Sequence, residues 1–355
     1  MQHEPASDVA AATRLSDFDF ELPAELIAQA PAERRDGARL LALERATGAL
    51  RHGYIHDLPG LLRAGDLLVF NDARVRPARL HGRTPTGGAV ELLLVRELAA
   101  GTWECLGRPA RRLRDGAAIE LPGGAAAAVV ERRGPGRYAV RFEAGCGVTE
   151  LLEQYGELPL PPYIKRPHGP LPSDLERYQT VFARRDGALA APTAGLHFTA
   201  SLLETLAANG VAHAWVTLAV GPATFLPLRD GADAADRLEA EWAELPEATV
   251  EAIARTRRAG GRVVAVGTTT TRALESAARR GDGLAAGGFW ADAFIRPGHR
   301  FAAVDALLTN FHLPGSTLIL LVAAFAGRHT LLSAYATAVR ERYRFYSYGD
   351  AMLIA

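Results

Sequence analysis

The chain has 355 residues, of which 48% are hydrophobic and 23% are charged, and this globular composition excludes an intrinsically disordered protein. Its 40 acidic and 40 basic residues balance, which neither favours nor excludes a nucleic-acid partner, because a local basic patch is compatible with zero net charge. The longest apolar run, residues 318–326, is too short to cross a bilayer, so we expect a buried helix there and no membrane partner.

The cysteines and the single lysine carry further information. Cys105 and Cys146 lie far apart, and no cluster of His, Cys or Asp has metal-ligand spacing, so the sequence predicts no metal site. Together with the lack of a signal-peptide pattern, this favours a reduced cytoplasm. Lys165 is the only lysine, and we interpret it as a residue present for its amine. The sequence leaves the oligomeric state open, with a monomer as our expectation.

The first 75 residues predict a short tail followed by small elements. Residues 1–14 are typical of a flexible tail. Residues 67–70 form a continuous apolar run, which indicates a buried strand, and Asn71 and Asp72 after it indicate a turn.

Between residues 76 and 156 the pattern changes to short alternating runs separated by glycine, proline and charged turns. These runs are residues 90–95, 103–106, 117–121, 126–131 and 137–142. Strands at such short and regular spacing predict a small all-β domain, a barrel or a sandwich, and we expect a barrel.

After a proline-rich stretch, residues 158–172, helices and strands alternate. Thr199 predicts the cap of a helix that ends at Asn209, and Pro246 predicts the start of another. Strands are expected at residues 211–220 and 262–266, and a helix at 269–279. The sequence therefore predicts the α/β class, with a large barrel-like α/β domain (15–75 and 157–355) interrupted by an inserted β-barrel domain (76–156).

Polar segments at the ends of apolar elements supply the candidate site. In residues 191–198, small residues and a glycine permit close approach of a ligand, and His197 comes just before a helix; a structural histidine is the alternative. Residues 266–272 join a buried strand to a helix, which is where open α/β sheets bind ligands. The alternative there is a capped helix with Arg272 and Glu275 as a surface pair.

Two further polar segments follow. Residues 309–317 lead into the apolar run, and residues 343–350 combine aromatic side chains with arginine and aspartate. The second mixture suits base stacking, but it equally suits a firmly packed C-terminus. A phosphate loop and a convincing dinucleotide fingerprint are both missing from the sequence.

In this order the segments match one family. The match includes residues 27–29, 71–80, 158–166 and 177–181 as well as 190–199, 309–317 and 343–354, and it extends from about residue 15 to the last residue. On these motifs the chain resembles the S-adenosylmethionine:tRNA ribosyltransferase-isomerases of queuosine synthesis. The resemblance implies a large α/β domain with an inserted β-barrel, as the pattern itself predicts.

The resemblance also implies a reaction and its partners. The ribosyl part of S-adenosylmethionine is transferred and isomerised onto the aminomethyl group of a 7-deazaguanine in tRNA, giving epoxyqueuosine, adenine and methionine. S-adenosylmethionine is consumed as a co-substrate, so neither a cofactor nor a metal is implied.

Residue roles follow from residue type. The sulfonium acidifies the ribose C5′ hydrogens, and we expect His197 or His312 to act as the base, with Glu275 as a third catalytic candidate. Glu275 or Asp350 is expected to balance the sulfonium charge, and Asn310 and the threonine loop to contact the departing adenine. The expected substrate-binding residues are Thr193, Gly195, Gly267, Thr268, Thr269, Arg272, Asn310, Lys165, Tyr348 and Asp350. The expected RNA-binding residues are Arg74, Arg79 and Arg166.

One patch departs from the family pattern. Ala219, Asp236 and Glu239 stand where the family pattern has histidine. This change supports an alternative, a paralogue that uses S-adenosylmethionine with a different, small-molecule acceptor. A third hypothesis is a non-catalytic RNA-binding protein that holds a phosphate backbone with the arginines of residues 108–114.

Overall fold

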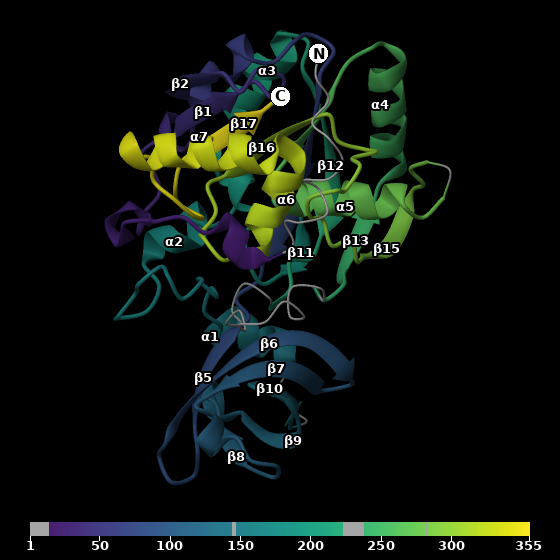
Figure 1. The fold of residues 1–355 in the computed structure, drawn as a ribbon. Helices are drawn as coiled ribbons and strands as arrows, with labels where there is room; N and C mark the ends of the chain where they lie inside the picture. Colours follow the sequence, from purple (N-terminus) through teal and green to yellow (C-terminus); the bar gives the residue numbers. More distant parts are fainter. Residues whose placement is uncertain (1–13, 144–146, 223–237, 282) are drawn as a thin grey trace.

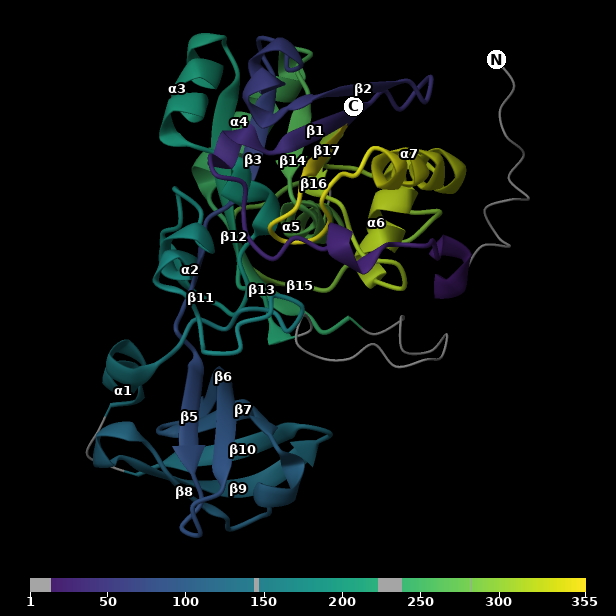
Figure 2. The ribbon, with the colours of Figure 1, turned by 90° about the vertical axis from the view of Figure 1, so that its left-hand side faces the viewer.

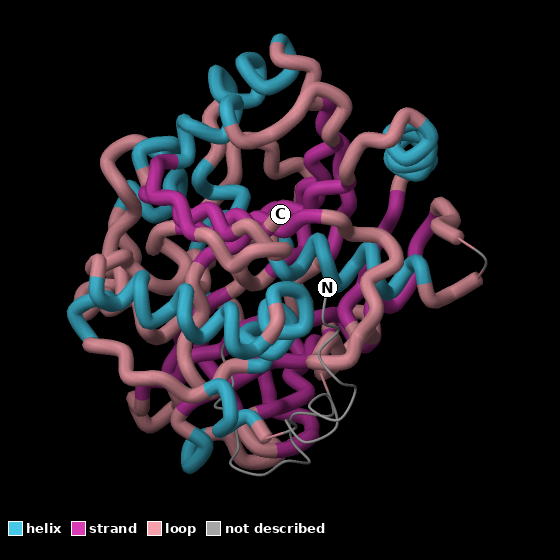
Figure 3. Tube along the Cα trace, turned by 45° about the horizontal axis from the view of Figure 1, so that its top comes forward, coloured by secondary structure: helices cyan, strands magenta, loops and turns pink. Residues whose placement is uncertain are grey.

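The structure is a computed structural model that describes residues 14–143, 147–222, 238–281 and 283–355. It has two parts, a large α/β domain and a small closed barrel that projects from it (Figures 1 and 2). In Figure 3 the strands run through the middle of the large domain and the helices lie around them.

The described elements have the following bounds. The strands are β1 Arg39–Leu43, β2 Leu50–Tyr54, β3 Leu67–Asn71, β4 Ala73–Val75, β5 Arg79–Arg83, β6 Ala89–Ala99, β7 Thr102–Arg108, β8 Ala118–Glu120, β9 Ala126–Gly134, β10 Arg137–Phe142, β11 Arg185–Ala188, β12 Ala212–Leu218, β13 Glu241–Leu245, β14 Val263–Val266, β15 Gly287–Ala291, β16 Ala306–Asn310 and β17 Ala351–Ile354. The helices are α1 Val148–Tyr155, α2 Pro172–Arg177, α3 Ala200–Ala208, α4 Glu247–Arg258, α5 Thr268–Ala278, α6 Thr317–Ala326 and α7 Arg328–Arg340.

The large domain is built on a mixed nine-stranded sheet. Its strand order is β15-β13-β12-β3-β14-β16-β17-β1-β2, and the neighbours β12, β3, β14 and β16 are all parallel to one another. Strands β13 and β15 extend one edge in antiparallel fashion. Because the four central strands point the same way, their carboxyl ends meet at one edge of the sheet.

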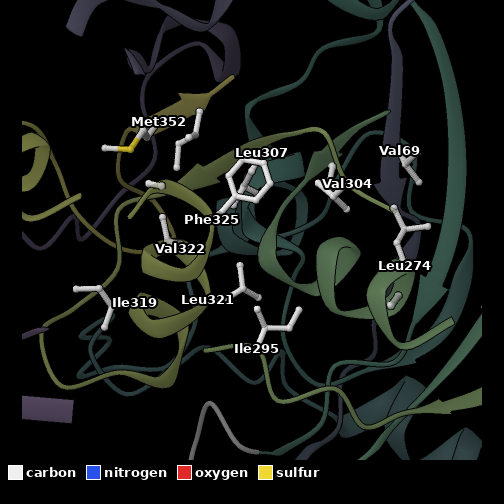
Figure 4. Close-up of a cluster of buried hydrophobic side chains, with 14 of the residues drawn as sticks. Val69, Leu274, Ile295, Val304, Leu307, Ile319, Leu321, Val322, Phe325 and Met352 are labelled. Atoms are coloured by element: carbon white, nitrogen blue, oxygen red, sulfur yellow. The ribbon is translucent and has the colours of Figure 1, made fainter. Parts of the chain in front are cut away.

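Both faces of the central strands are buried, which explains their continuous apolar sequences. Leu67 and Val69 of β3 face a cluster that includes residues of α4, α5, α6 and α7, while Leu68 and Phe70 face a second cluster that contains α3. Figure 4 shows the first cluster, where Val322 and Phe325 of α6 lie with side chains of the sheet and of α5.

The small domain is a closed barrel with the order β10-β7-β6-β5-β8-β9. It lies within residues 76–156, the segment expected to form an inserted domain. Its core is separate from that of the sheet and includes Leu92, Tyr138 and Val140, and α1 adds Leu151 and Leu152 to it. Alternating burial along its strands, as in the Arg79–Arg83 strand β5, explains why period-two sequence patterns were informative here.

The α/β class with an inserted small barrel is confirmed, whereas the large domain is built on a sheet with edge strands β15 and β2 and not on a barrel-like arrangement. Thr199 caps α3 as predicted, because its hydroxyl accepts the Leu202 N–H at 3.1 Å. Pro246 is the cap of α4 and not its first residue. Strands β1, β2 and β17 were not predicted individually, and they complete the sheet from both ends of the chain.

The helices of the described chain are short. None of its helices alone is long and apolar enough to cross a bilayer; α6 and α7 reach that limit only together, and the chain bends by 113° between them.

Candidate active site

A cavity of about 230 Å³ lies where the central strands end. Val220 follows β12, Gly267 follows β14 and Asn310 ends β16, and all three line the cavity. The fold therefore brings together segments that are far apart in sequence, at the edge where parallel sheets bind ligands.

The turn after β14 forms one wall. Gly267 has a φ of +97°, which L side chains rarely adopt, so glycine is required there. The turn places Thr268 and Thr269 on the cavity at the start of α5. The next two threonines do not face the ligand space, because their hydroxyls donate to the carbonyls of Val266 and Gly267.

Asn310 leaves an acceptor unused in the cavity wall. Its side-chain NH₂ donates to the Tyr346 carbonyl at 3.0 Å, and its Oδ1 is buried without a hydrogen-bond partner among the described residues. Tyr178, whose hydroxyl lies near Ala191 and Ser347, also lines the cavity. A buried polar atom without a partner costs free energy, so Asn310 Oδ1 indicates a ligand that would satisfy it.

Two tyrosines form an aromatic wall. The rings of Tyr163 and Tyr346 lie 3.8 Å apart between centroids at 82°, and the Tyr163 hydroxyl is hydrogen-bonded to Ser347. Tyr346 has a φ of +77°, a conformation that non-glycine residues adopt mainly at functional sites and tight turns. Burial raises the pKa of Tyr163 well above its usual range, so its hydroxyl stays protonated at neutral pH.

A buried ion pair closes another side. Arg272 Nη1 donates to Glu241 Oε2 at 2.5 Å, and the other carboxylate oxygen accepts the Gly221 N–H at 2.7 Å. Arg272 also donates to the carbonyls of Ala293 and Glu239, so each of its three guanidinium nitrogens makes a hydrogen bond. Burial raises the pKa of Glu241, although Arg272 opposes the rise. The pair places a carboxylate at the cavity.

His312 is the histidine that lines this cavity. Its Nε2 lies 3.0 Å from the Thr309 hydroxyl, and its backbone N–H donates to the Tyr335 hydroxyl. Burial lowers the pKa of His312 to about 4. The ring is therefore neutral at pH 7 and has an unprotonated nitrogen to offer.

His197 lies behind the wall. It ends the 3₁₀ turn Thr193–His197 and borders a separate hollow of about 20 Å³, and its Nε2 is 3.3 Å from Asn310 Nδ2. Burial lowers its pKa to about 4 as well. His197 does not line the cavity, and it contacts the cavity wall through Asn310.

Comparison with known proteins identifies the family. The model of a family described as "Queuosine biosynthesis protein" matches residues 15–354. The chain belongs to this family. It is 53% identical over 342 residues to the S-adenosylmethionine:tRNA ribosyltransferase-isomerases of Citrifermentans bemidjiense and Pelobacter propionicus, with 96% of this chain and 99% of each relative covered.

A solved structure of the same family agrees with the fold. It is the crystal structure of S-adenosylmethionine tRNA ribosyltransferase from Thermotoga maritima, which is 38% identical, has a TM-score of 0.56 and covers 96% of this chain and 100% of its own. The queuosine-synthesis resemblance seen in the sequence is thereby confirmed, and the chain is an enzyme of queuosine tRNA modification.

Several expected residues of this family member lie away from the cavity. Glu275 accepts the N–H groups of Ala302, Ala303 and Val304 and contacts His299. Although burial opposes it, these hydrogen bonds lower the pKa of Glu275. Its carboxylate is committed to holding the loop before β16, so the expected roles as a catalytic group and sulfonium counter-charge are corrected, and Glu241 is the carboxylate at the cavity.

The C-terminal segment is pinned, as the alternative interpretation held. Asp350 accepts the N–H groups of Arg39 and Arg344, and the Tyr348 hydroxyl donates to Asp174. Neither residue lines the cavity, in contrast to their expected roles in substrate binding. Gly195 is likewise required by packing, because a Cβ there would lie 2.8 Å from Phe182 and 2.9 Å from Thr180.

The remaining expectations divide between three places. Thr193, Gly267, Thr268, Thr269, Arg272, Asn310 and His312 line the cavity. Lys165, Arg79 and Arg166 lie together at a second, larger hollow beside the barrel. Arg74 is separate and exposed, with an ion pair to Asp186 and a hydrogen bond to the Ala183 carbonyl.

The altered family patch lies close to the junction of the two domains. Glu239 forms an ion pair with Arg137 of the barrel at 2.5 Å, so a link between the domains stands where the family pattern has histidine. Ala219 continues the pairing of β12 with β13, because its N–H donates to the Trp242 carbonyl. Asp236 lies outside the described residues.

Sequence reasoning missed the aromatic wall and Glu241. Tyr163 sits in a family motif, and Glu241 keeps its place in the pattern beside the altered patch, so both gave a signal. Tyr178 and Tyr346 gave none that separates a cavity wall from a core. Among the residues that the structure describes, no three His, Cys, Asp or Glu side chains are grouped to hold a metal ion.

Proposed function

We propose that this enzyme transfers the ribosyl group of S-adenosylmethionine to 7-aminomethyl-7-deazaguanine in tRNA and isomerises it, giving epoxyqueuosine-tRNA, adenine and methionine. The observation that carries the proposal is the identity of 53% over nearly the whole chain with relatives named S-adenosylmethionine:tRNA ribosyltransferase-isomerase. S-adenosylmethionine is consumed here as a co-substrate, not kept as a cofactor. Because the acceptor is tRNA, we place the reaction in the cytoplasm.

The cavity supports a cationic, nucleoside-like ligand. The phenol rings of Tyr163 and Tyr346 suit a sulfonium, since cations are attracted to aromatic faces. The Glu241 carboxylate lines the same cavity, where Arg272 balances its charge. Asn310 Oδ1 is free to accept a hydrogen bond from a polar edge of the nucleoside.

His312 is the best-placed base for the first step. The sulfonium acidifies the neighbouring C5′ hydrogens, and a neutral imidazole on the cavity wall can accept one of these protons. The hydrogen bond between His312 Nε2 and Thr309 fixes one ring nitrogen, which orients the other. Neighbouring donors, the hydroxyls of Thr268 and Thr269, line the space in which the departing adenine can be held.

The reaction can be tested directly. Incubating the protein with S-adenosylmethionine and tRNA that carries the aminomethyl-deazaguanine should release adenine and methionine in equal amounts. Adenine at the level of a no-enzyme control would reject the proposal.

The altered patch is the observation behind the alternative of a small-molecule acceptor. Glu239 is taken up by the ion pair with Arg137, so this residue serves the domain junction and not an acceptor pocket. The full-length relation to tRNA-modifying relatives favours the tRNA reaction, and the family finding sets aside the non-catalytic hypothesis. Turnover with the free deazaguanine base but none with tRNA would instead support the paralogue.

A further inference from the structure

A second hollow of about 900 Å³ separates the barrel from the large domain. One side consists of residues on β5, β6 and β7, and the other of the proline-rich segment 157–170. We call this hollow the junction groove. Its volume is far greater than that of the cavity. S-adenosylmethionine, which we place in the cavity, does not need this second space.

The junction groove carries an excess of positive charge. Arg79, Arg108, Lys165 and Arg166 line it together with two histidines, against the carboxylates of Glu91 and Glu157. Arg166 is paired with the buried carboxylate of Asp174 at 2.7 Å, so the excess charge rests on Lys165 and on the two arginines that share Glu91. Glu91 is shared between Arg79, at 3.3 Å, and Arg108, at 2.7 Å, so one carboxylate neutralises two arginines only in part. Such a surface attracts a polyanion.

Lys165 is the one lysine of the chain, and its amine is available. Its side chain is exposed in the groove, and none of the described residues forms a hydrogen bond or an ion pair with its Nζ. Its backbone is fixed nevertheless, because its N–H donates to Gln29 Oε1 at 2.9 Å. Gln29 Nε2 donates to the Tyr163 carbonyl at 2.9 Å, and Arg166 donates to the Gln29 carbonyl, so the whole stretch is held.

The groove and the cavity share this stretch of chain. Tyr163 lines the cavity, while the next two residues, Ile164 and Lys165, line the groove. A polymer with one unit in the cavity can therefore continue past Tyr163 and reach the amine of Lys165. A small acceptor would have no reason to extend that far.

We propose that the junction groove binds the sugar–phosphate backbone of tRNA beside the reacting nucleotide, with the Lys165 amine as a phosphate contact. The proposal rests on the proposed function, since it assigns the position of the acceptor of that reaction. Arg108 and His168 provide further cationic or hydrogen-bonding groups on either side of the groove.

The test measures tRNA binding over a series of salt concentrations, for the full chain and four variants. Lys165→Ala should weaken binding about three- to tenfold and flatten the slope of log Kd against log salt by about 0.7–0.9, as expected for one lost phosphate contact. Lys165→Glu should have a larger effect of the same kind, and Lys165→Arg should restore binding. Arg51→Ala, an exposed arginine on β2 at the far end of the large domain (Figure 1), is the matched control and should bind as the parent does.

Two outcomes would overturn the proposal. The first is a Lys165→Glu variant that binds tRNA with the parent's affinity and salt slope. The second is tRNA binding that stays unchanged when inorganic phosphate at millimolar concentration saturates the groove. The binding measurement does not depend on turnover. If the Lys165 variants change the salt slope but the parent protein releases no adenine, the proposed reaction is rejected and the groove proposal stands. If the parent protein releases adenine but the Lys165 variants leave the slope unchanged, the groove proposal is rejected and the proposed reaction stands.

Discussion

The cavity wall around His312 and the hollow around His197 look alike in residue type but differ in access. Both histidines are buried, both have a pKa of about 4, and both lie in polar loops of the family motifs. His312 borders a cavity of about 230 Å³, whereas His197 borders a hollow of about 20 Å³. The two histidines therefore differ in the hollow that each one borders and not in the direction or size of the pKa shift.

Asn310 connects the two regions. Its amide lies 3.3 Å from His197 Nε2 on one side, and its Oδ1 is unpartnered at the cavity on the other. We therefore propose different roles for the two residues, contact with the substrate for His312 and support of Asn310 for His197. Each of the following predictions separates these roles or tests their common environment.

The largest effect is expected at the cavity histidine. His312→Gln keeps a polar group near Thr309 but removes the imidazole, so single-turnover adenine release should fall by roughly two to four orders of magnitude. Thermal melting should show that the variant is folded. His213→Gln, at an exposed histidine on β12, is the control and should react at the parent's rate. A normal rate for His312→Gln would transfer the role of base elsewhere.

The buried ion pair on the same wall should have the next largest effect. Glu241→Gln leaves the Arg272 guanidinium buried without its counter-charge, which should lower the free energy of unfolding by about 3 kcal/mol. Arg272→Met should cost a similar amount. If the two charges stabilise each other, the double variant should be less destabilised in urea than the sum of the single variants. Simple additivity would show that the pair is not coupled.

A smaller and different effect is expected behind the wall. His197→Ala should lower the free energy of unfolding by about 1–3 kcal/mol, because Asn310 loses a buried partner. Turnover should fall less than in the His312 variant, since the change reaches the substrate only through Asn310. Melting and single-turnover rates measured side by side give the answer. A stable variant with a rate loss as large as that of His312→Gln would restore His197 as the base.

The fold was largely predictable because its signals are local. Alternation of period two marked the barrel strands, and Thr199 and Asn209 marked the start and the end of α3. Strands β1 and β17 gave weaker signals, since a parallel pair formed by opposite ends of the chain depends on contacts that no local window contains.

The site was predictable as a set of segments but not as a set of side chains. Polar loops at strand ends located the cavity, yet Glu275 and Glu241 could not be told apart in the sequence. Glu241 reaches the cavity because it starts β13, where its neighbour Trp242 points outward, while Glu275 is on the α5 face that meets the loop before β16. Such choices depend on how elements pack, which residue type alone does not specify.

The smallest prediction concerns pH, where the two histidines should behave alike. In the unfolded chain each has a pKa near 6.5, and burial lowers it to about 4 in the folded protein. Between these values the unfolded state binds protons that the folded state does not, so the free energy of unfolding should fall as pH drops through this window. The loss should be about 1 kcal/mol per pH unit for each histidine between pH 5.5 and 4.5.

Urea unfolding at several pH values tests this shared property of the wall and the hollow. His197→Asn and His312→Asn should each flatten the pH dependence between about pH 6.5 and 4 by a similar amount, because the same desolvation lowers both pKa values. Above pH 7 neither variant should change the slope, since both imidazoles are then neutral in the folded and unfolded states. If only one variant flattens the pH dependence, the histidine replaced in the other variant is in contact with water in the folded protein. If that histidine is His197, the hollow behind Asn310 is open to the cavity.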